Sequence, residues 1–321
     1  MICNNCKDAY FRAKLIKMIK GKWQHSDPLL KMLLFCGIVM TCFGLISVLN
    51  IPLVKIFFGK SLSEVMTGFS SGDTTYINAM KFIQIFSQLG LMLVPAWLCG
   101  WLFSDNISLF FQFKKINFLQ IAVIVVVTIC LSPLINLLLD WNSHLQLPAS
   151  LAAMEKMMRN METEAEKLTE SFLVMHTNFD LIINLSMIAL LPAVGEELLF
   201  RGVLQNLIQQ ATKNQHWAVI ITGFIFSAIH MQFFGFLPRF MLGVFLGYLL
   251  VWTGSIWAPI LAHFINNGSA VLLSYYEQKN AININEEKIG IREGEFWMVI
   301  ASVIITVSAC YILYRSKQKS T

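Results

Sequence analysis

Three apolar segments in the second half of the chain contain side chains that can exchange protons or donate hydrogen bonds. These residues are Glu196, Glu197 and Arg201 in the first segment, His230 in the second, and His263 and Asn267 in the third. An ionisable group inside a membrane costs about 2.5–3.5 kcal/mol on insertion scales, so such groups indicate a functional site. The pattern therefore predicts a polar site within an apolar bundle.

The spacing along the chain predicts that Glu196 and His230 lie at the same depth. Each is 17 residues from Lys213, the centre of the polar turn between their two segments. At 1.5 Å per residue, each lies about 25 Å along its helix from that turn. His263 falls near the middle of the segment 256–275, so three helices are expected to bring these three side chains together.

Helical spacing assigns the first group to two faces. Glu197 and Arg201 are four residues apart, so they are expected to form a structural ion pair. Glu196 is rotated by about 100° from Glu197, which leaves it free to face a cavity.

These residue types suit the hydrolysis of an amide bond. Glu196 can deprotonate a water molecule, and His230 can help to hold and polarise that water. His263 and Asn267, four residues apart, can donate hydrogen bonds to a developing oxyanion. Phe226 lies one turn before His230 and is expected to pack against its imidazole ring.

A zinc site is the alternative chemistry. Glu196, His230 and His263 are the ligand types of a catalytic zinc ion with an open fourth position. The chain has no His-Glu-x-x-His pair, so the zinc pattern is weak, and zinc stays the alternative. Because the residues give a complete set without a metal, we expect a mechanism that needs no metal and no other cofactor.

Three motifs occur in order within the region 181–275: Glu-Glu-x-x-x-Arg, Phe-x-x-x-His and His-x-x-x-Asn. In this order on separate apolar segments, they resemble the CAAX-protease and bacteriocin-processing family of intramembrane endopeptidases. The resemblance implies an eight-helix fold that cleaves peptide bonds of a membrane-associated peptide or protein. It also implies that Glu196 is the water-activating base, with His230 beside it and His263 and Asn267 as the oxyanion site.

The composition of the whole chain is typical of a membrane protein. Of its 321 residues, 56% are hydrophobic and 13% are charged, whereas soluble proteins have about 25% charged residues. Apolar segments long enough to cross a bilayer recur along the chain. They lie at 32–54, 79–103, 118–139, 181–209, 217–234, 236–252, 256–275 and 296–314. We therefore expect an all-α, polytopic membrane bundle of about eight transmembrane helices in one domain, 32–314, with a re-entrant segment as the alternative at 236–252.

The distribution of charge predicts the orientation in the membrane. The segment 1–31 has seven Lys and Arg residues against two Asp, and the tail 315–321 is also basic. Basic segments beside membrane spans are retained in the cytoplasm. Both termini are therefore expected to be cytoplasmic, in an integral protein of a bacterial inner membrane that binds no nucleic acid.

The loop 141–180 is acidic and is expected on the outer side. Within it, apolar residues recur at steps of three and four from Leu151 to Met175. This periodicity predicts an amphipathic helix at about 149–176, at the membrane surface or over the bundle. Such a helix either connects two spans or serves as a gate or docking element.

The other polar residues of the spans are expected to have structural roles. Lys55, Lys81 and Arg239 lie near span ends and are expected to extend to the interface. Gln84 and Gln88 are expected to bond neighbouring helices.

Two other functional classes are compatible with the sequence. A non-catalytic membrane scaffold or bacteriocin-immunity factor would have the same fold. A transporter would use the buried Glu and His as a proton relay, although no internal repeat is evident. The identity of the substrate and the oligomeric state are not indicated.

Overall fold

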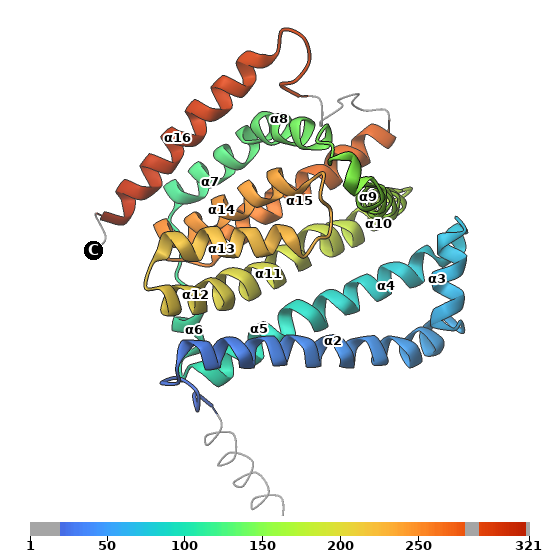
Figure 1. Ribbon diagram of the computed structural model, residues 1–321, viewed down its shortest axis with the longest axis horizontal. Helices are drawn as coiled ribbons and strands as arrows, with labels where there is room; N and C mark the ends of the chain where they lie inside the picture. Colours follow the sequence, from blue (N-terminus) through green and yellow to red (C-terminus); the bar gives the residue numbers. More distant parts are fainter. Residues whose placement is uncertain (1–19, 280–288, 319–321) are drawn as a thin grey trace, which may run out of the picture.

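The structure is a computed structural model that describes residues 20–279 and 289–318 (Figure 1). Every regular element in these residues is helical. Most of the basic segment 1–31, the last three residues of the basic tail and residues 280–288 between the last two predicted spans lie outside the described residues.

The helices follow one another with short connections. They are α2 (Pro28–Phe58), α3 (Leu62–Ser70), α4 (Ile77–Gln88), α5 (Val94–Phe103), α6 (Ile107–Phe110), α7 (Phe118–Cys130), α8 (Ser132–Ser143), α9 (Ala152–Leu173), α10 (Asn178–Asn184), α11 (Leu191–Glu197), α12 (Gln205–Thr212), α13 (Gln215–Ala228), α14 (Phe236–Thr253), α15 (Trp257–Gln278) and α16 (Phe296–Gln318). Single 3₁₀ turns precede α4 and α9, at Thr74–Tyr76 and Ala149–Leu151.

Six helical stretches of the described chain are long and apolar enough to cross a membrane. They are Pro28–Phe58, Thr74–Phe103, Phe118–Ser143, Asn178–Thr212, Phe236–Thr253 and Phe296–Ser316. The prediction of an all-α, polytopic membrane bundle is confirmed, whereas the count of about eight spans is not.

The two remaining predicted spans differ from these six in length or polarity. Helix α13 has 14 residues, or about 21 Å, which is shorter than a hydrocarbon layer of about 30 Å. Helix α15 has 22 residues but contains the polar group around His263. The segment 236–252, for which a re-entrant alternative was open, forms the 18-residue helix α14.

The stretch Asn178–Thr212 is one helix interrupted by two π-helical turns, Leu185–Leu190 and Leu198–Leu204. Pro192 follows the first turn closely. A proline within a helix lacks an N–H donor and clashes with the carbonyl four residues earlier, and a wider turn accommodates both effects. The π-helical turns lie on either side of α11, which contains Glu196 and Glu197.

Helices α13 and α14 form a close antiparallel pair on the other side of this stretch. A Cβ atom at Gly243 would lie 3.0 Å from the Cα of Gly223, so neither position has room for a side chain. The close approach leaves the carbonyl oxygen of Gly243 accessible to a neighbouring helix.

Figure 1 shows α11 to α15 in the middle of the molecule, with α2 and α16 at its opposite sides. Helix α2 packs on α4, α5 and α12, and α16 packs on α7, α8 and α14. The turn at Lys213 lies at one end of the bundle, and α3 and α9 lie at the other. Lys213 has the left-handed conformation that ends α12, as expected for the centre of the turn.

Candidate active site

A cavity of about 460 Å³ lies among α4, α9, α11, α13, α14 and α15. Five of the seven residues singled out in the sequence line it. These residues are Glu196, Phe226, His230, His263 and Asn267. Glu197 and Arg201, the remaining two, are buried behind its wall.

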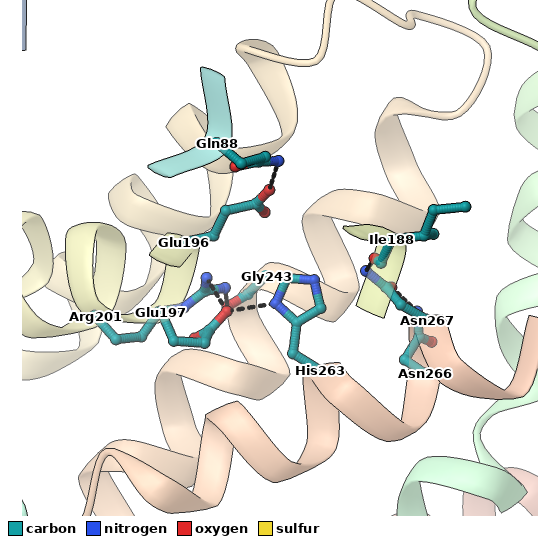
Figure 2. Close-up of polar contacts among 9 residues, drawn as sticks. All are labelled: Gln88, Ile188, Glu196, Glu197, Arg201, Gly243, His263, Asn266 and Asn267. Atoms are coloured by element: carbon teal, nitrogen blue, oxygen red, sulfur yellow. Dashed lines mark hydrogen bonds and ion pairs between the residues drawn. The ribbon is translucent and has the colours of Figure 1, made fainter. Parts of the chain in front are cut away.

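Glu196 presents its carboxylate to this cavity. Its side chain is 7% exposed, and Oε1 accepts a hydrogen bond from Nε2 of Gln88 at 3.4 Å. Figure 2 shows that Glu196 and Glu197 leave the helix in different directions, as the rotation between adjacent positions requires. The carboxylate also interacts electrostatically with His263.

Glu197 and Arg201 form a fully buried ion pair. Nη1 of Arg201 lies 2.8 Å from Oε1 of Glu197, and both side chains are inaccessible to solvent. Nη2 of Arg201 donates to the carbonyl oxygen of Gly243 at 3.0 Å. The guanidinium group also lies over the ring of Phe226, 4.5 Å from its centroid. Arg201 therefore joins the stretch Asn178–Thr212 to α13 and α14.

Glu197 also holds His263, which the sequence analysis did not predict. Nδ1 of His263 lies 2.8 Å from the same Oε1 atom that binds Arg201 (Figure 2). A carboxylate accepts, so Nδ1 carries the proton and Nε2 is left for the cavity. Glu197 is therefore a positioning residue for His263 as well as a partner in the ion pair.

His230 lies in the turn after α13 and not within a helix. The helix ends at Ala228, six residues before the end of the predicted segment 217–234. Nδ1 of His230 donates to the carbonyl oxygen of Phe226 at 2.7 Å, and the two rings pack at 5.1 Å between centroids. This bond orients Nε2 as the free ring nitrogen.

Asn267 is fixed by two amide hydrogen bonds. Its Nδ2 donates to the carbonyl oxygen of Ile188 at 3.1 Å, and its Oδ1 accepts from Nδ2 of Asn266 at 3.0 Å (Figure 2). One N–H of the amide is left for another acceptor. Among the described residues, no hydrogen bond joins Asn267 to His263, so the two are oriented separately.

Polar residues that the sequence analysis did not assign to the site also line the cavity. Gln84, Arg239 and Asn266 line it. Arg239 is half-buried and donates to Oε1 of Gln232 at 2.7 Å, so the expectation that it extends to the interface is wrong. Lys81, given the same expectation, is 8% exposed, whereas Lys55 is exposed.

Helix α9 covers the cavity and contacts the turn that follows His230. Leu168 and Phe172 line the cavity from α9. Oε2 of Glu162 accepts from the backbone N–H of Phe234 at 2.8 Å, and the guanidinium of Arg159 lies 3.9 Å from the centroid of the Phe234 ring. The helix therefore supports the turn directly.

The residues considered as zinc ligands each have a hydrogen-bond partner. In the described chain, no group of three or more His, Cys, Asp or Glu side chains is arranged to hold a metal ion. Glu196 bonds to Gln88, and the Nδ1 atoms of both histidines have partners, which leaves both Nε2 atoms free. A zinc-binding histidine also commonly donates its other ring N–H in this way, so these bonds do not distinguish the two mechanisms.

The fold and the cavity together define a class: a polytopic membrane protein with glutamate, histidine and asparagine side chains around one buried cavity. Comparison with known families finds a match for the part of the chain that contains the predicted site residues. Residues 178–269 match the family described as "Type II CAAX prenyl endopeptidase Rce1-like". This part of the chain is similar to that family, as the three motifs indicated, and the matched residues include all seven predicted site residues.

The comparison with curated proteins finds a partial relative. The "Uncharacterized protein YpbD" of Bacillus subtilis (strain 168) is 34% identical over 82 residues, which are 24% of this chain and 39% of that protein. The chain thus covers well under two thirds of the relative's length. No solved structure matches the chain.

Proposed function

We propose that the protein is an intramembrane endopeptidase that hydrolyses peptide bonds of membrane-associated peptides or proteins. The observation that carries this proposal is the cavity of about 460 Å³ around Glu196, His230, His263 and Asn267, within a helical membrane bundle. The family match supports the same activity, because its printed description names an endopeptidase.

The proposed mechanism uses a water molecule activated by Glu196. The carboxylate takes a proton from the water as the water oxygen bonds to the peptide carbonyl carbon, and returns that proton to the amine as the C–N bond breaks. The free Nε2 of His230 accepts a hydrogen bond from this water. The oxyanion receives the spare N–H of Asn267 and, when His263 is protonated, its Nε2–H.

Replacement of Glu196 tests the proposal. Glu196→Gln keeps the shape and the bond to Gln88 but removes the base, so we expect cleavage to fall by about 10²- to 10⁴-fold. Peptides that co-purify with this variant supply candidate substrates, and their cleavage by the unsubstituted protein in liposomes is followed by mass spectrometry. Glu164→Gln on the exposed face of α9 is the matched control and should retain full activity. Undiminished cleavage by Glu196→Gln contradicts the mechanism.

Two further measurements separate the alternatives. Cleavage that persists in a strong chelator supports the glutamate mechanism, and loss that zinc restores supports the metal alternative. If the unsubstituted protein cleaves nothing, and its cellular phenotype survives both Glu196→Ala and His230→Ala, a non-catalytic scaffold or immunity factor is supported instead.

A further inference from the structure

Pro192 lines the cavity that contains Glu196 and lies one helical turn before that residue. In an unbroken α-helix, the N–H of residue 192 would donate to the carbonyl oxygen of Ile188. Proline has no N–H, and its ring clashes with the carbonyl group four residues earlier. The Ile188 carbonyl oxygen therefore lacks the donor that regular helix geometry would give it.

The neighbouring N–H of Leu191 does not take the place of this donor. It is the last N–H before the proline, and it donates five residues back, to the carbonyl oxygen of Ser186. This is the bond of a π-helical turn, which is wider than an α-helical one. The wide turn and the proline together leave the Ile188 carbonyl open to the side of the helix.

The side chain of Asn267 uses this open carbonyl. Its Nδ2 donates to the oxygen of Ile188 at 3.1 Å (Figure 2). Helix α15 lies close to the turn at this level, because a Cβ atom at Gly268 would be 3.8 Å from the Cβ of Ala189. A main-chain carbonyl of one helix thus holds a site residue of another.

This carbonyl decides which way the Asn267 amide faces. A carbonyl oxygen accepts hydrogen bonds and cannot donate one, so the NH₂ group must point towards Ile188. Oδ1 points elsewhere and accepts from Nδ2 of Asn266 at 3.0 Å. An amide rotated by 180° would place two oxygen atoms against each other. The second N–H of Asn267 therefore keeps a defined direction beside the cavity.

We propose that Pro192 is a positioning residue for the reaction, because it keeps the Ile188 carbonyl open to the Asn267 amide. An N–H at residue 192 would compete with Nδ2 of Asn267 for this oxygen. Without the ring, the turn would also relax towards an α-helix and direct the carbonyl along the helix axis. The oxyanion donor would then be present but misdirected. The inference rests on the proposed function, in which Asn267 donates to the oxyanion.

The test compares two replacements of Pro192 that have the same side chain. Pro192→Ala introduces an N–H. Lactic acid at position 192, inserted by nonsense suppression with an acylated tRNA, has the same methyl group but an ester oxygen in place of the N–H. Both lack the proline ring, so a difference between them reports the N–H alone. Cleavage of a peptide that co-purifies with Glu196→Gln gives kcat and KM for each.

Pro192→Ala should lower kcat by about 10- to 100-fold, somewhat less than complete removal of an oxyanion donor. KM should change by less than about twofold, because the affected interaction forms only in the transition state. Lactic acid at position 192 should restore most of kcat. Undiminished kcat in Pro192→Ala overturns the inference. An equal loss in both replacements also overturns it, because the ring and not the missing N–H would then matter.

Pro95→Ala is the matched control. Pro95 is buried and follows another π-helical turn, Leu89–Leu93, where the N–H of Val94 donates to the carbonyl oxygen of Leu89. It is not among the residues that line the cavity. Its replacement makes the same change in a helix and should leave kcat unchanged. A fall as large as that of Pro192→Ala would show a general effect of relaxed turns and would contradict the inference.

Thermal unfolding separates this inference from the proposed function. Asn267→Ala should lower the Tm of the otherwise unsubstituted protein, because it removes the bond to Ile188. The same change should lower the Tm less when Pro192→Ala is also present, because the new N–H then serves that carbonyl. Such coupling supports the inference even if no peptide is cleaved. Equal losses of Tm in the two backgrounds overturn it even if cleavage depends on Glu196.

Discussion

Glu197 uses one carboxylate oxygen for two partners, Arg201 and His263. Its other oxygen, Oε2, has no hydrogen-bond partner in the described chain. The arrangement ties the orientation of the His263 imidazole to a buried ion pair. The ion pair and the position of His263 are therefore expected to change together.

Replacing both partners of the ion pair separates stability from activity. Removing one member of a buried ion pair leaves an uncompensated charge and costs about 3–5 kcal/mol. Glu197→Gln and Arg201→Met are each expected to lower the Tm of the detergent-solubilised protein strongly. The combined variant should recover much of the loss, because no unpaired charge is left.

The combined variant should nevertheless stay about 10²-fold below the unsubstituted protein in kcat, because His263 lacks its carboxylate acceptor. Thermal unfolding and peptide cleavage are measured on the same preparations. Recovery of both properties would mean that Glu197 has a purely structural role.

Helix periodicity predicted which residues share a face of a helix. It did not predict which residues of neighbouring helices bond to them. Sequence spacing placed Glu196, His230 and His263 at one cavity, because their distances from chain turns fix their depth. It predicted that Gln88 bonds a neighbouring helix, but not that the partner is Glu196, and it did not single out Asn266, since an amide in a span gives no direction around the bundle. It also missed that α13 ends before His230, which a continuous apolar run to residue 234 conceals.

Helix α9 is anchored at its start by Glu155. The carboxylate accepts from the backbone N–H of Leu147 at 2.8 Å and from Nε of Arg159 at 3.0 Å. The Leu147 N–H and then Arg159 hold the pKa of Glu155 below its ordinary value of 4.5. Arg159 in turn lies over Phe234, in the turn after His230.

Acid should therefore release the start of α9. The anchor is fully present above about pH 4.5 and is lost as the pH falls through the lower pKa of the folded state. The protection factor for hydrogen exchange of the peptide around Leu147, which corrects for the intrinsic effect of pH, should fall in that acidic range. Glu155→Gln should show faster exchange at neutral pH and a weaker response to acid, whereas identical acid profiles would mean that Glu155 does not anchor α9.

At the scale of the whole molecule, composition and run length were sufficient to predict a helical membrane bundle. They did not settle the number of spans, because α13 is short and α15 is polar at its centre. Both of these helices line the cavity, and neither is both long and apolar enough to be recognised as a membrane span. Prediction of membrane topology is least secure where function places polar groups.

The orientation of the bundle can be tested by labelling two exposed positions at its opposite ends. Glu164 lies on α9, and Lys213 lies at the turn between α12 and α13. If both termini are cytoplasmic, Glu164→Cys should react with a membrane-impermeant maleimide on intact cells. Lys213→Cys should react only after the membrane is opened.

The unsubstituted protein, with its native cysteines, gives the background for each condition. Labelling of Lys213→Cys but not Glu164→Cys on intact cells would reverse the proposed orientation.

The π-helical turns beside α11 have a consequence for how the chain tolerates changes in length. A turn closed by an i to i+5 bond contains one residue more than the α-helical turn that could replace it. Deleting one residue within Leu198–Leu204 would let an unbroken α-helix form there. Such a helix would keep both Glu196 and α12 in place, because the turn that is lost contained the extra residue. A single-residue deletion between Glu197 and Arg201 is therefore expected to preserve insertion in the membrane, while it changes the spacing of the ion pair from four residues to three.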